Sequence, residues 1–210
     1  MRIRIIYQKT LPLRFTSALD MQLIWERSLR RSSLHITYSQ GFHPKPKIQL
    51  GLPLPLGFMS DEEIVDIWIE DKVSADQLLE LIQPNLPIGL TISSIEEIDF
   101  SQKPVVTRIT TAEYVVKFWD QDVNRDALQT KINSLLLTEK IIRTKRNKKQ
   151  YDLRPLIKSV RLLPDLEIVD GFALFIALCS EQNRMGRADE VMFALDFSLE
   201  EFLIKRTKTY

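Results

Sequence analysis

The order of the predicted elements indicates an α+β fold with two ferredoxin-like (βαββαβ) units in tandem. One observation is the order strand–helix–strand–strand–helix–strand over residues 1–100, and the other is its recurrence over residues 101–210. The halves share this architecture without evident residue-level identity. We therefore expect two domains: 1–100, with a Gly-Phe-His-Pro loop, and 101–210, with a basic hairpin. A hydrophobic content of 44% with 27% charged residues is ordinary for a soluble globular protein.

The first predicted unit opens with alternating Arg and Ile in Arg2–Lys9, which is typical of a strand with one apolar face. Ser17 followed three residues later by Asp20 predicts a capping box and a helix to about Ser32. Apolar or small side chains recur at helical spacing in this helix: Met21, Ile24, Trp25 and Ser28.

The rest of the first unit consists of short elements separated by proline. We expect short strands near residues 36–38 and 48–52, and a longer one over 63–70. Ser74 is expected to cap a helix over 76–83, which Pro84 terminates. A strand over 91–98 completes the order.

The second unit repeats the order with an added hairpin. We expect a strand over 112–119, a helix over 123–137 and a strand over 139–144. A basic turn at 145–150 leads into strand residues as far as Leu163. A strongly apolar strand over 171–179, a helix over 187–195 and a strand over 202–207 follow.

The stretch from Tyr38 to Lys47 concentrates loop-forming and ligand-binding residue types. Gly41 permits a positive φ, and the two prolines at 44 and 46 stiffen the chain. A stiff loop that presents Phe42, His43 and lysines suits a planar, anionic ligand. The alternatives are a proline-rich connection between two strands, or a Phe42 that fills the core.

The net charge of +1 conceals separate basic and acidic blocks. Residues 1–50 hold nine Lys/Arg against two Asp/Glu, and residues 51–100 hold one against eleven. Residues 101–150 are again basic, with eleven against five. Basic blocks of this kind suit phosphate contacts, whereas the alternative is that the blocks neutralise each other within the fold.

Several functional classes are excluded by what the sequence lacks. Cys179 is the single cysteine, so an intrachain disulfide is impossible, which suits a reducing cytoplasm. The charged N-terminus and the absence of an 18-residue apolar run predict neither a signal peptide nor a membrane span. His35, His43 and Cys179 have no metal-ligand spacing. We expect no metal, no cofactor, no nucleotide-binding loop and no membrane contact.

Four stretches together resemble one bacterial family. They are Phe15-Thr16-Ser17-Ala18-Leu19-Asp20, Glu26-Arg27-Ser28-Leu29-Arg30-Arg31, the loop Tyr38–Lys47 and Leu52-Pro53-Leu54-Pro55-Leu56-Gly57. This is the radical-SAM-linked protein family, a domain of unknown function found fused to, or encoded beside, a radical S-adenosylmethionine protein. Tyr151-Asp152-Leu153-Arg154-Pro155 is a further match. One departure is Ala18, where the family commonly has a histidine.

The resemblance implies a radical S-adenosylmethionine protein as partner. One cysteine cannot supply the three ligands that the cluster of such an enzyme needs, so this chain is not itself that enzyme. We expect a cytoplasmic, non-catalytic accessory protein that binds RNA and works with that partner in RNA modification. A protein-only adaptor and a metal-independent ribonuclease that uses His43 are the alternatives.

The residues expected to contact RNA are basic or aromatic. They are Arg27, Arg31, Phe42, His43, Lys45, Lys47, Arg143, Lys145, Arg146, Lys148 and Lys149. For Arg27 and Arg31 the alternative is ion pairing with the acidic residues between Asp61 and Asp71, and for 143–149 it is a solvated hairpin tip.

Overall fold

The computed structural model describes residues 1–118, 124–145, 148–164, 172–181 and 183–210. The chain divides into two compact units, Met1–Arg108 (unit 1) and Ile109–Tyr210 (unit 2). Both are α+β, and together they are the two ferredoxin-like units that the sequence predicts. Residues 101–108, which we placed in the second domain, group with unit 1.

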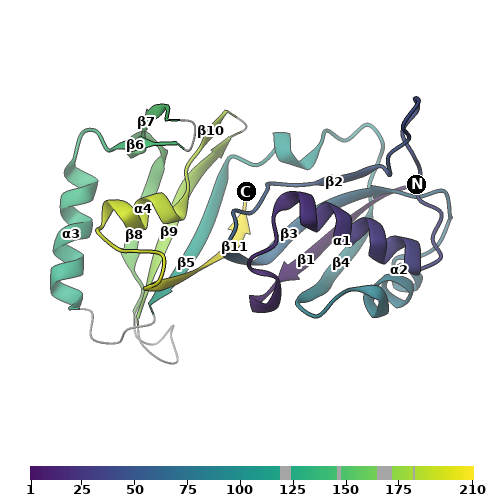
Figure 1. Cartoon of the computed structure of the whole chain (residues 1–210), viewed down its shortest axis with the longest axis horizontal. Coiled ribbons are helices and arrows are strands. Elements are labelled where there is room, and N and C mark those ends of the chain that lie inside the picture. Colours follow the sequence, from purple (N-terminus) through teal and green to yellow (C-terminus); the bar gives the residue numbers. More distant parts are fainter. Residues whose placement is uncertain (119–123, 146–147, 165–171, 182) are drawn as a thin grey trace. The chain divides into compact units, whose positions relative to one another are not determined.

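Unit 1 has the predicted order of four strands and two α-helices (Figure 1). Its elements are β1 (Arg2–Lys9), α1 (Ala18–Arg31), β2 (Ile48–Leu50), β3 (Phe58–Trp68), α2 (Ala75–Ile82) and β4 (Leu90–Glu97), with short 3-10 turns η1 (Leu11–Leu13), η2 (Gln83–Asn85) and η3 (Val105–Thr107). The strands pair in the order β4-β1-β3-β2, all antiparallel. This is the ferredoxin-like arrangement.

Strand alternation gives the sheet of unit 1 one helix-covered face. Ile3 and Ile5 of β1 point to this face with Val65 and Ile67 of β3, and all four are buried. Helix α1 lies across this face (Figure 1) and buries Trp25 completely. The opposite face carries Arg2, Arg4 and Asp66 at neighbouring register positions.

The start of α1 follows the local sequence signal. The Ser17 side chain accepts a hydrogen bond from the Asp20 N–H at 3.2 Å, and Asp20 Oδ2 accepts one from the Ser17 N–H at 2.9 Å. This capping box satisfies two backbone donors at the helix start. The hydroxyl and amide hydrogen bonds hold the pKa of Asp20 below its ordinary value.

Unit 2 repeats the arrangement with an inserted hairpin. Its elements are β5 (Thr111–Phe118), α3 (Arg125–Leu137), β6 (Ile142–Thr144), β7 (Gln150–Asp152), η4 (Arg154–Leu156), β8 (Ile157–Leu162), β9 (Ala173–Glu181), β10 (Arg184–Met185), α4 (Ala188–Ala194) and β11 (Phe202–Thr209). The main sheet has the order β11-β5-β9-β8, all antiparallel. Strands β6 and β7 form a separate hairpin.

The core of unit 2 is packed between this sheet and helices α3 and α4. Leu128 and Ile132 of α3 and Val191 and Met192 of α4 are buried. An aromatic group closes one end, where the Phe118 ring lies 4.9 Å from that of Phe172 and 4.8 Å from that of Phe197.

Several predicted boundaries differ from the structure. Strand β3 begins at Phe58, before the expected residue 63, and residues 36–38 make only isolated bridges, Ile36 to Ile69 and Tyr38 to Pro46. Strand β6 begins at Ile142 and not at the expected residue 139; residues 139–141 connect α3 to the hairpin. The predicted ends at Trp119, Val123 and Gly171 lie outside the described residues. Within the described part of the chain, no helix combines the length and apolarity needed to cross a membrane.

Candidate nucleic-acid interface

The Gly-Phe-His-Pro loop (residues 39–47) is closed at its base by backbone hydrogen bonds. The Ser39 N–H donates to the Lys45 carbonyl at 2.8 Å, and the Lys45 N–H donates to Ser39 Oγ at 3.0 Å. One step further, the Lys47 N–H donates to the Thr37 carbonyl at 2.8 Å. These hydrogen bonds use backbone and a serine hydroxyl, so the larger side chains of the tip are left for other interactions.

The side chains of this loop point into solvent. Phe42 is 103% exposed, as much as in an extended chain, so it does not fill the core. His43, Lys45 and Lys47 are also exposed. Gly41 has φ +132°, and a Cβ there would have nothing within 4 Å, so backbone conformation rather than space calls for glycine.

The base of the loop rests on the end of β3. The Thr37 N–H donates to the Trp68 carbonyl at 2.8 Å, and the Trp68 N–H donates to the Lys47 carbonyl at 3.1 Å. The tip is therefore carried by a strand of the sheet. In the part of the chain that the structure describes, the His43 ring makes no hydrogen bond.

The two predicted arginines of α1 differ in their surroundings. Arg27 lies on the helix surface, whereas Arg31 donates to Ser28 Oγ at 3.2 Å and to the Asn85 carbonyl at 2.6 Å. Arg31 thus ties the end of α1 to η2. Among the described residues, no ion pair joins either arginine to the acidic stretch 61–71.

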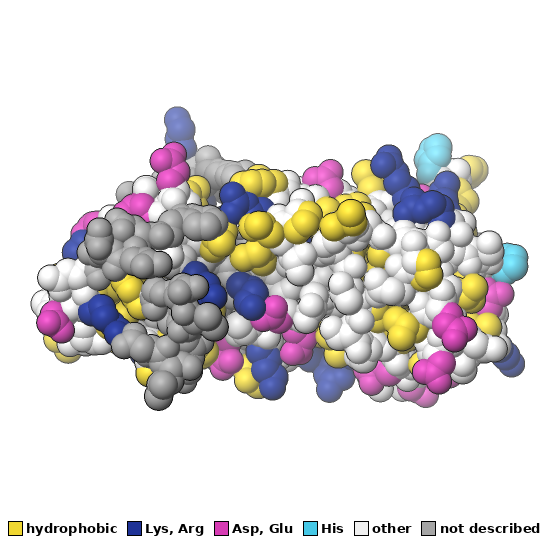
Figure 2. All heavy atoms as spheres, turned by 90° about the horizontal axis from the view of Figure 1, so that it is seen from below, with side chains coloured by type: hydrophobic (Ala, Val, Ile, Leu, Met, Phe, Trp, Pro, Cys, Tyr) yellow, Lys and Arg dark blue, Asp and Glu magenta, His cyan; other side chains and the backbone are white. Residues whose placement is uncertain are grey.

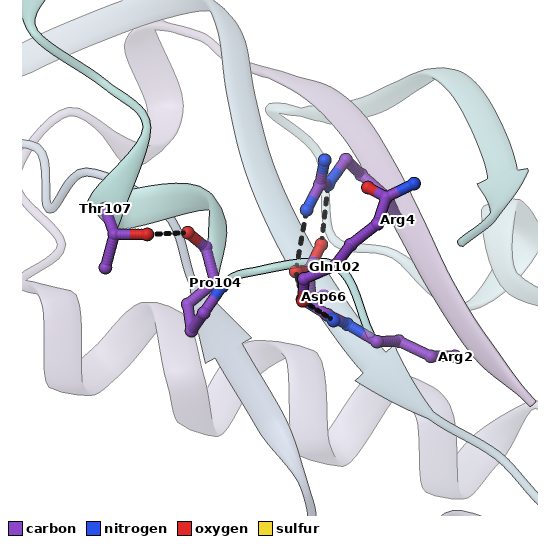
Figure 3. Close-up of polar contacts among 6 residues, drawn as sticks. All are labelled: Arg2, Arg4, Asp66, Gln102, Pro104 and Thr107. Carbon is purple, nitrogen blue, oxygen red and sulfur yellow. Dashed lines mark hydrogen bonds and ion pairs between the residues drawn. The ribbon is translucent and has the colours of Figure 1, made fainter. Parts of the chain in front are cut away.

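The acidic stretch pairs with other cations instead. Asp66 is fully buried and accepts hydrogen bonds from Arg2 at 2.6 Å and from Arg4 Nε and Nη2 at 2.8 and 3.0 Å (Figure 3). This hydrogen bonding raises the pKa of Arg4. Asp71 accepts from the His35 ring at 3.0 Å, which raises the pKa of His35 and lowers that of Asp71.

A connecting segment covers this face of unit 1. Arg2 donates to the Gln102 carbonyl at 2.7 Å (Figure 3), and the Ile98 N–H donates to the Arg2 carbonyl at 2.9 Å. Val105 is buried, and a Cβ at Gly51 would lie 3.2 Å from its Cγ1. Residues 98–107 therefore close the sheet face that the helices leave uncovered, and this is why 101–108 group with unit 1.

Charges of opposite sign gather separately on the surface of unit 1. In the view of Figure 2, the side of the molecule that holds unit 1 shows one group of Lys and Arg and a separate group of Asp and Glu. Within the basic block of residues 1–50, Arg2 and Arg4 pair with Asp66, and Arg30 pairs with Glu26 on the surface.

The basic hairpin of unit 2 is only partly available for phosphate contacts. Arg143 Nε donates to Glu190 Oε2 at 2.6 Å, and its guanidinium lies 5.7 Å from the Phe193 ring, so Arg143 fastens the hairpin to α4. The tip is closed by the Lys145 N–H, which donates to the Lys149 carbonyl at 2.9 Å, and Lys148 has φ +63°.

Three tip lysines, Lys145, Lys148 and Lys149, are exposed. Lys145 Nζ lies 5.2 Å from the ring of Tyr151. Burial, together with the charge of Glu190, raises the pKa of Tyr151 to about 12, so its hydroxyl stays protonated at neutral pH. Arg146 lies outside the described residues.

The structure thus brings the predicted residues together in groups. Phe42, His43, Lys45 and Lys47 share one loop of unit 1, and the tip lysines share one hairpin of unit 2. Arg27 and Arg31 lie on α1, and no hydrogen bond joins them to the loop within the described residues. All of these assignments to RNA remain predictions.

Sequence reasoning missed a buried polar cluster near the start of α1. A cavity of about 20 Å³ is lined by Tyr7, Lys9, Ala18 and Glu63, among others, which is room for about one water. Lys9 donates to the Thr16 carbonyl at 3.1 Å. Ala18, which departs from the family pattern, thus lies beside buried polar groups. The described residues contain no group of three or more His, Cys, Asp and Glu that could hold a metal ion.

Both sheets follow the ferredoxin-like order, so the protein is of the tandem ferredoxin-like class. The chain belongs to the family described as an uncharacterized protein conserved in bacteria (DUF2344), whose model matches residues 2–187. No curated protein matches the chain. A similar solved structure is that of the first two RRM domains of yeast poly(U) binding protein (Pub1), at 12% identity over 96% of this chain and 98% of that chain, with a TM-score of 0.24.

Proposed function

We propose that this chain is a non-catalytic protein that binds single-stranded RNA through the Gly-Phe-His-Pro loop of unit 1. The observation that carries the proposal is the fully exposed Phe42 beside His43 and two lysines, in a loop whose shape is fixed by its backbone. Unpaired bases stack on aromatic rings, and lysines neutralise the neighbouring phosphates.

The geometry favours unpaired over paired nucleic acid. A protruding aromatic ring can stack on a base only where the base is not already enclosed in a duplex. Lys45 and Lys47 lie two residues apart on the same strand of the loop, so both belong to the side that leads into β2. We expect a single strand to bind more tightly than a duplex of the same sequence.

Replacing Phe42 by Ala tests this directly. The loss of one base–aromatic stack should weaken RNA binding by about 1–3 kcal/mol. The melting temperature should remain that of the wild type, because the side chain faces solvent. Leu56→Ala is the matched control, since Leu56 is also an exposed apolar residue of unit 1, at 53%. Unchanged affinity in Phe42→Ala would contradict the proposal.

The lysines offer an independent measure. Lys45→Gln with Lys47→Gln should reduce the slope of log K against log salt by about 0.7 for each phosphate that is no longer neutralised. Lys72→Gln with Lys103→Gln removes two exposed lysines elsewhere in unit 1 and should leave the slope unchanged. Lys145→Gln with Lys148→Gln asks the same question of the hairpin, and an unchanged slope there would identify a solvated tip.

We also propose that the chain works with a radical S-adenosylmethionine partner in RNA modification. The support is the sequence resemblance, together with Leu19 and Leu23, which lie one turn apart on α1 and are exposed at 76% and 47%. Co-purification with a candidate radical S-adenosylmethionine protein tests it. Glu at positions 19 and 23 should abolish the complex, whereas Leu137→Glu, on α3, should not.

A further inference from the structure

The sheet of unit 2 has one face that α3 and α4 do not cover, and its side chains differ from those on the corresponding face of unit 1. Helices α3 and α4 pack on one side, where Tyr114, Val116 and Ile176 are buried. Alternation along the strands places Val115 and Phe175 on the other side. In unit 1 the corresponding face holds Asp66 between two arginines and is covered by residues 98–107.

The register aligns one row of side chains across the four main strands of unit 2. Arg161 of β8 pairs with Phe175 of β9, Phe175 with Val115 of β5, and Val115 with Lys205 of β11. The Arg161 guanidinium lies 4.7 Å from the centre of the Phe175 ring. One half-buried aromatic ring therefore lies at the centre of the face, with a cation near each end of its row.

The adjoining rows add further cations. Lys117 of β5 is exposed and pairs with Ala173 and Leu203, next to the Phe175 row. At the opposite end of the sheet face, near the starts of β8 and β5, Lys158 donates a hydrogen bond to the hydroxyl of Thr111.

Among the residues that the structure describes, acidic side chains are few in the middle of this face. Glu113 lies opposite Lys208 and accepts a hydrogen bond from the Tyr210 hydroxyl at 3.4 Å, and Glu181 lies at the end of β9, opposite Arg184. The described side chains at the centre of this face are therefore mainly cationic, around one aromatic ring.

We propose that this face of unit 2 binds a single-stranded RNA segment, with one base on Phe175 and the adjacent phosphates on Arg161 and Lys117. A half-buried aromatic ring flanked by exposed cations on one sheet face matches the alternation of bases and phosphates in an unpaired strand, and base stacking tolerates any sequence. The inference rests on the proposed RNA binding and assigns it a second binding surface, apart from the Gly-Phe-His-Pro loop.

The experiment titrates the full chain with a fluorescent single-stranded RNA over a range of salt concentrations. Arg161→Gln with Lys117→Gln should lower the slope of log K against log salt by about 1.4, because two phosphates lose their cations at about 0.7 each. Both side chains are exposed, so folding should be preserved. Lys72→Gln with Lys140→Gln, which removes one exposed lysine of unit 1 and one between α3 and β6, should leave the slope unchanged.

A second measurement locates the base. The same RNA carrying 5-iodouridine should crosslink to Phe175, and Phe175→Leu should weaken binding roughly 5- to 150-fold, the range expected for one stack. If Phe175→Leu unfolds the chain, the crosslink in the wild type still shows whether a base lies on Phe175. Single-stranded DNA of the same sequence measures how much of the binding depends on the 2′-hydroxyl.

The outcomes separate this inference from the proposed function. Weaker binding in Phe42→Ala, with a wild-type slope in Arg161→Gln/Lys117→Gln and no crosslink in β9, would overturn the inference and leave the proposed function standing. An absence of RNA binding by the wild type would overturn both. Binding of anionic vesicles in place of RNA, abolished in the double variant, would assign the face to a membrane surface and overturn the inference.

Discussion

Replacing Asp66 by Asn should be among the most destabilising single changes in unit 1. Asp66 is fully buried, and its two oxygens accept three hydrogen bonds from Arg2 and Arg4, at 2.6, 2.8 and 3.0 Å. Asn keeps the volume but removes the charge, which deprives two buried guanidiniums of the carboxylate that accepts their hydrogen bonds. Breaking a buried ion pair from one side costs about 3–5 kcal/mol, and we expect a loss of stability in that range.

Urea unfolding followed by tryptophan fluorescence measures this loss. Trp25 and Trp68 lie in unit 1 and Trp119 lies in unit 2, so a Trp119→Phe background reports the transition of unit 1 even if the two units unfold separately. Glu97→Gln is the control, because Glu97 is an exposed carboxylate of β4 in the same sheet, and its change should fall within about 0.5 kcal/mol.

A triple variant tests the reason for the loss. Replacing Arg2 and Arg4 by Met and Asp66 by Leu removes all three charges, and apolar replacements of buried ion clusters are often neutral or stabilising. We expect it to be more stable than Asp66→Asn. A loss below about 1 kcal/mol in Asp66→Asn, or a triple variant as unstable as the single one, would refute the reasoning.

Three further predictions concern unit 1. Trp25→Ala should cost about 3–5 kcal/mol, because Trp25 is fully buried with its ring 5.0 Å from that of Tyr7, and a loss under about 1 kcal/mol in urea would contradict this. Ser17→Ala should cost about 1 kcal/mol because the cap is removed, again by urea midpoint, and an unchanged midpoint would mean that the cap contributes nothing. The pKa of His35 should lie above 6.5 by NMR, because its ring pairs with Asp71, and should return toward 6.5 in Asp71→Asn; an unshifted His35 would exclude the pair. The raised pKa of His35 and the lowered pKa of Asp71 stabilise the fold between the unfolded values of about 3.9 and 6.5. This stabilisation is lost as pH rises through the folded pKa of His35 or falls through that of Asp71.

Local signals were readable from the sequence. The capping box of Ser17 and Asp20 and the alternation of Arg2–Lys9 depend on residues close in the chain, and α1 and β1 form as expected. The βαββαβ order then follows from the sequence of strands and helices, since short connections leave few ways to close the sheet.

Long-range pairing was not readable in the same way. Asp66 belongs to an acidic stretch, and only the register of β1 on β3 places it against Arg2 and Arg4 rather than Arg27 and Arg31. A shift of one residue would turn each side chain to the other face. Composition alone fixes no register, so the sequence could not select these partners.

The same limit applies to the candidate surfaces. Phe42 stands out in the sequence because glycine, prolines and lysines surround it, and the structure adds that it is fully exposed. Arg161 and Phe175 lie far apart in the chain without any motif, and the pairing of β8 with β9 brings them together. The basic run 143–149 is conspicuous in the sequence, but the sequence does not show that Arg143 forms an ion pair with Glu190.

Binding of the full chain to a fluorescent single-stranded RNA, against a duplex of the same sequence, tests the central claim most directly. We predict that the single strand binds more tightly, that log K falls linearly with log salt, and that Phe42→Ala weakens binding by about 1–3 kcal/mol without lowering the melting temperature. Equal affinity for strand and duplex, or an affinity that Phe42→Ala leaves unchanged, would contradict the account.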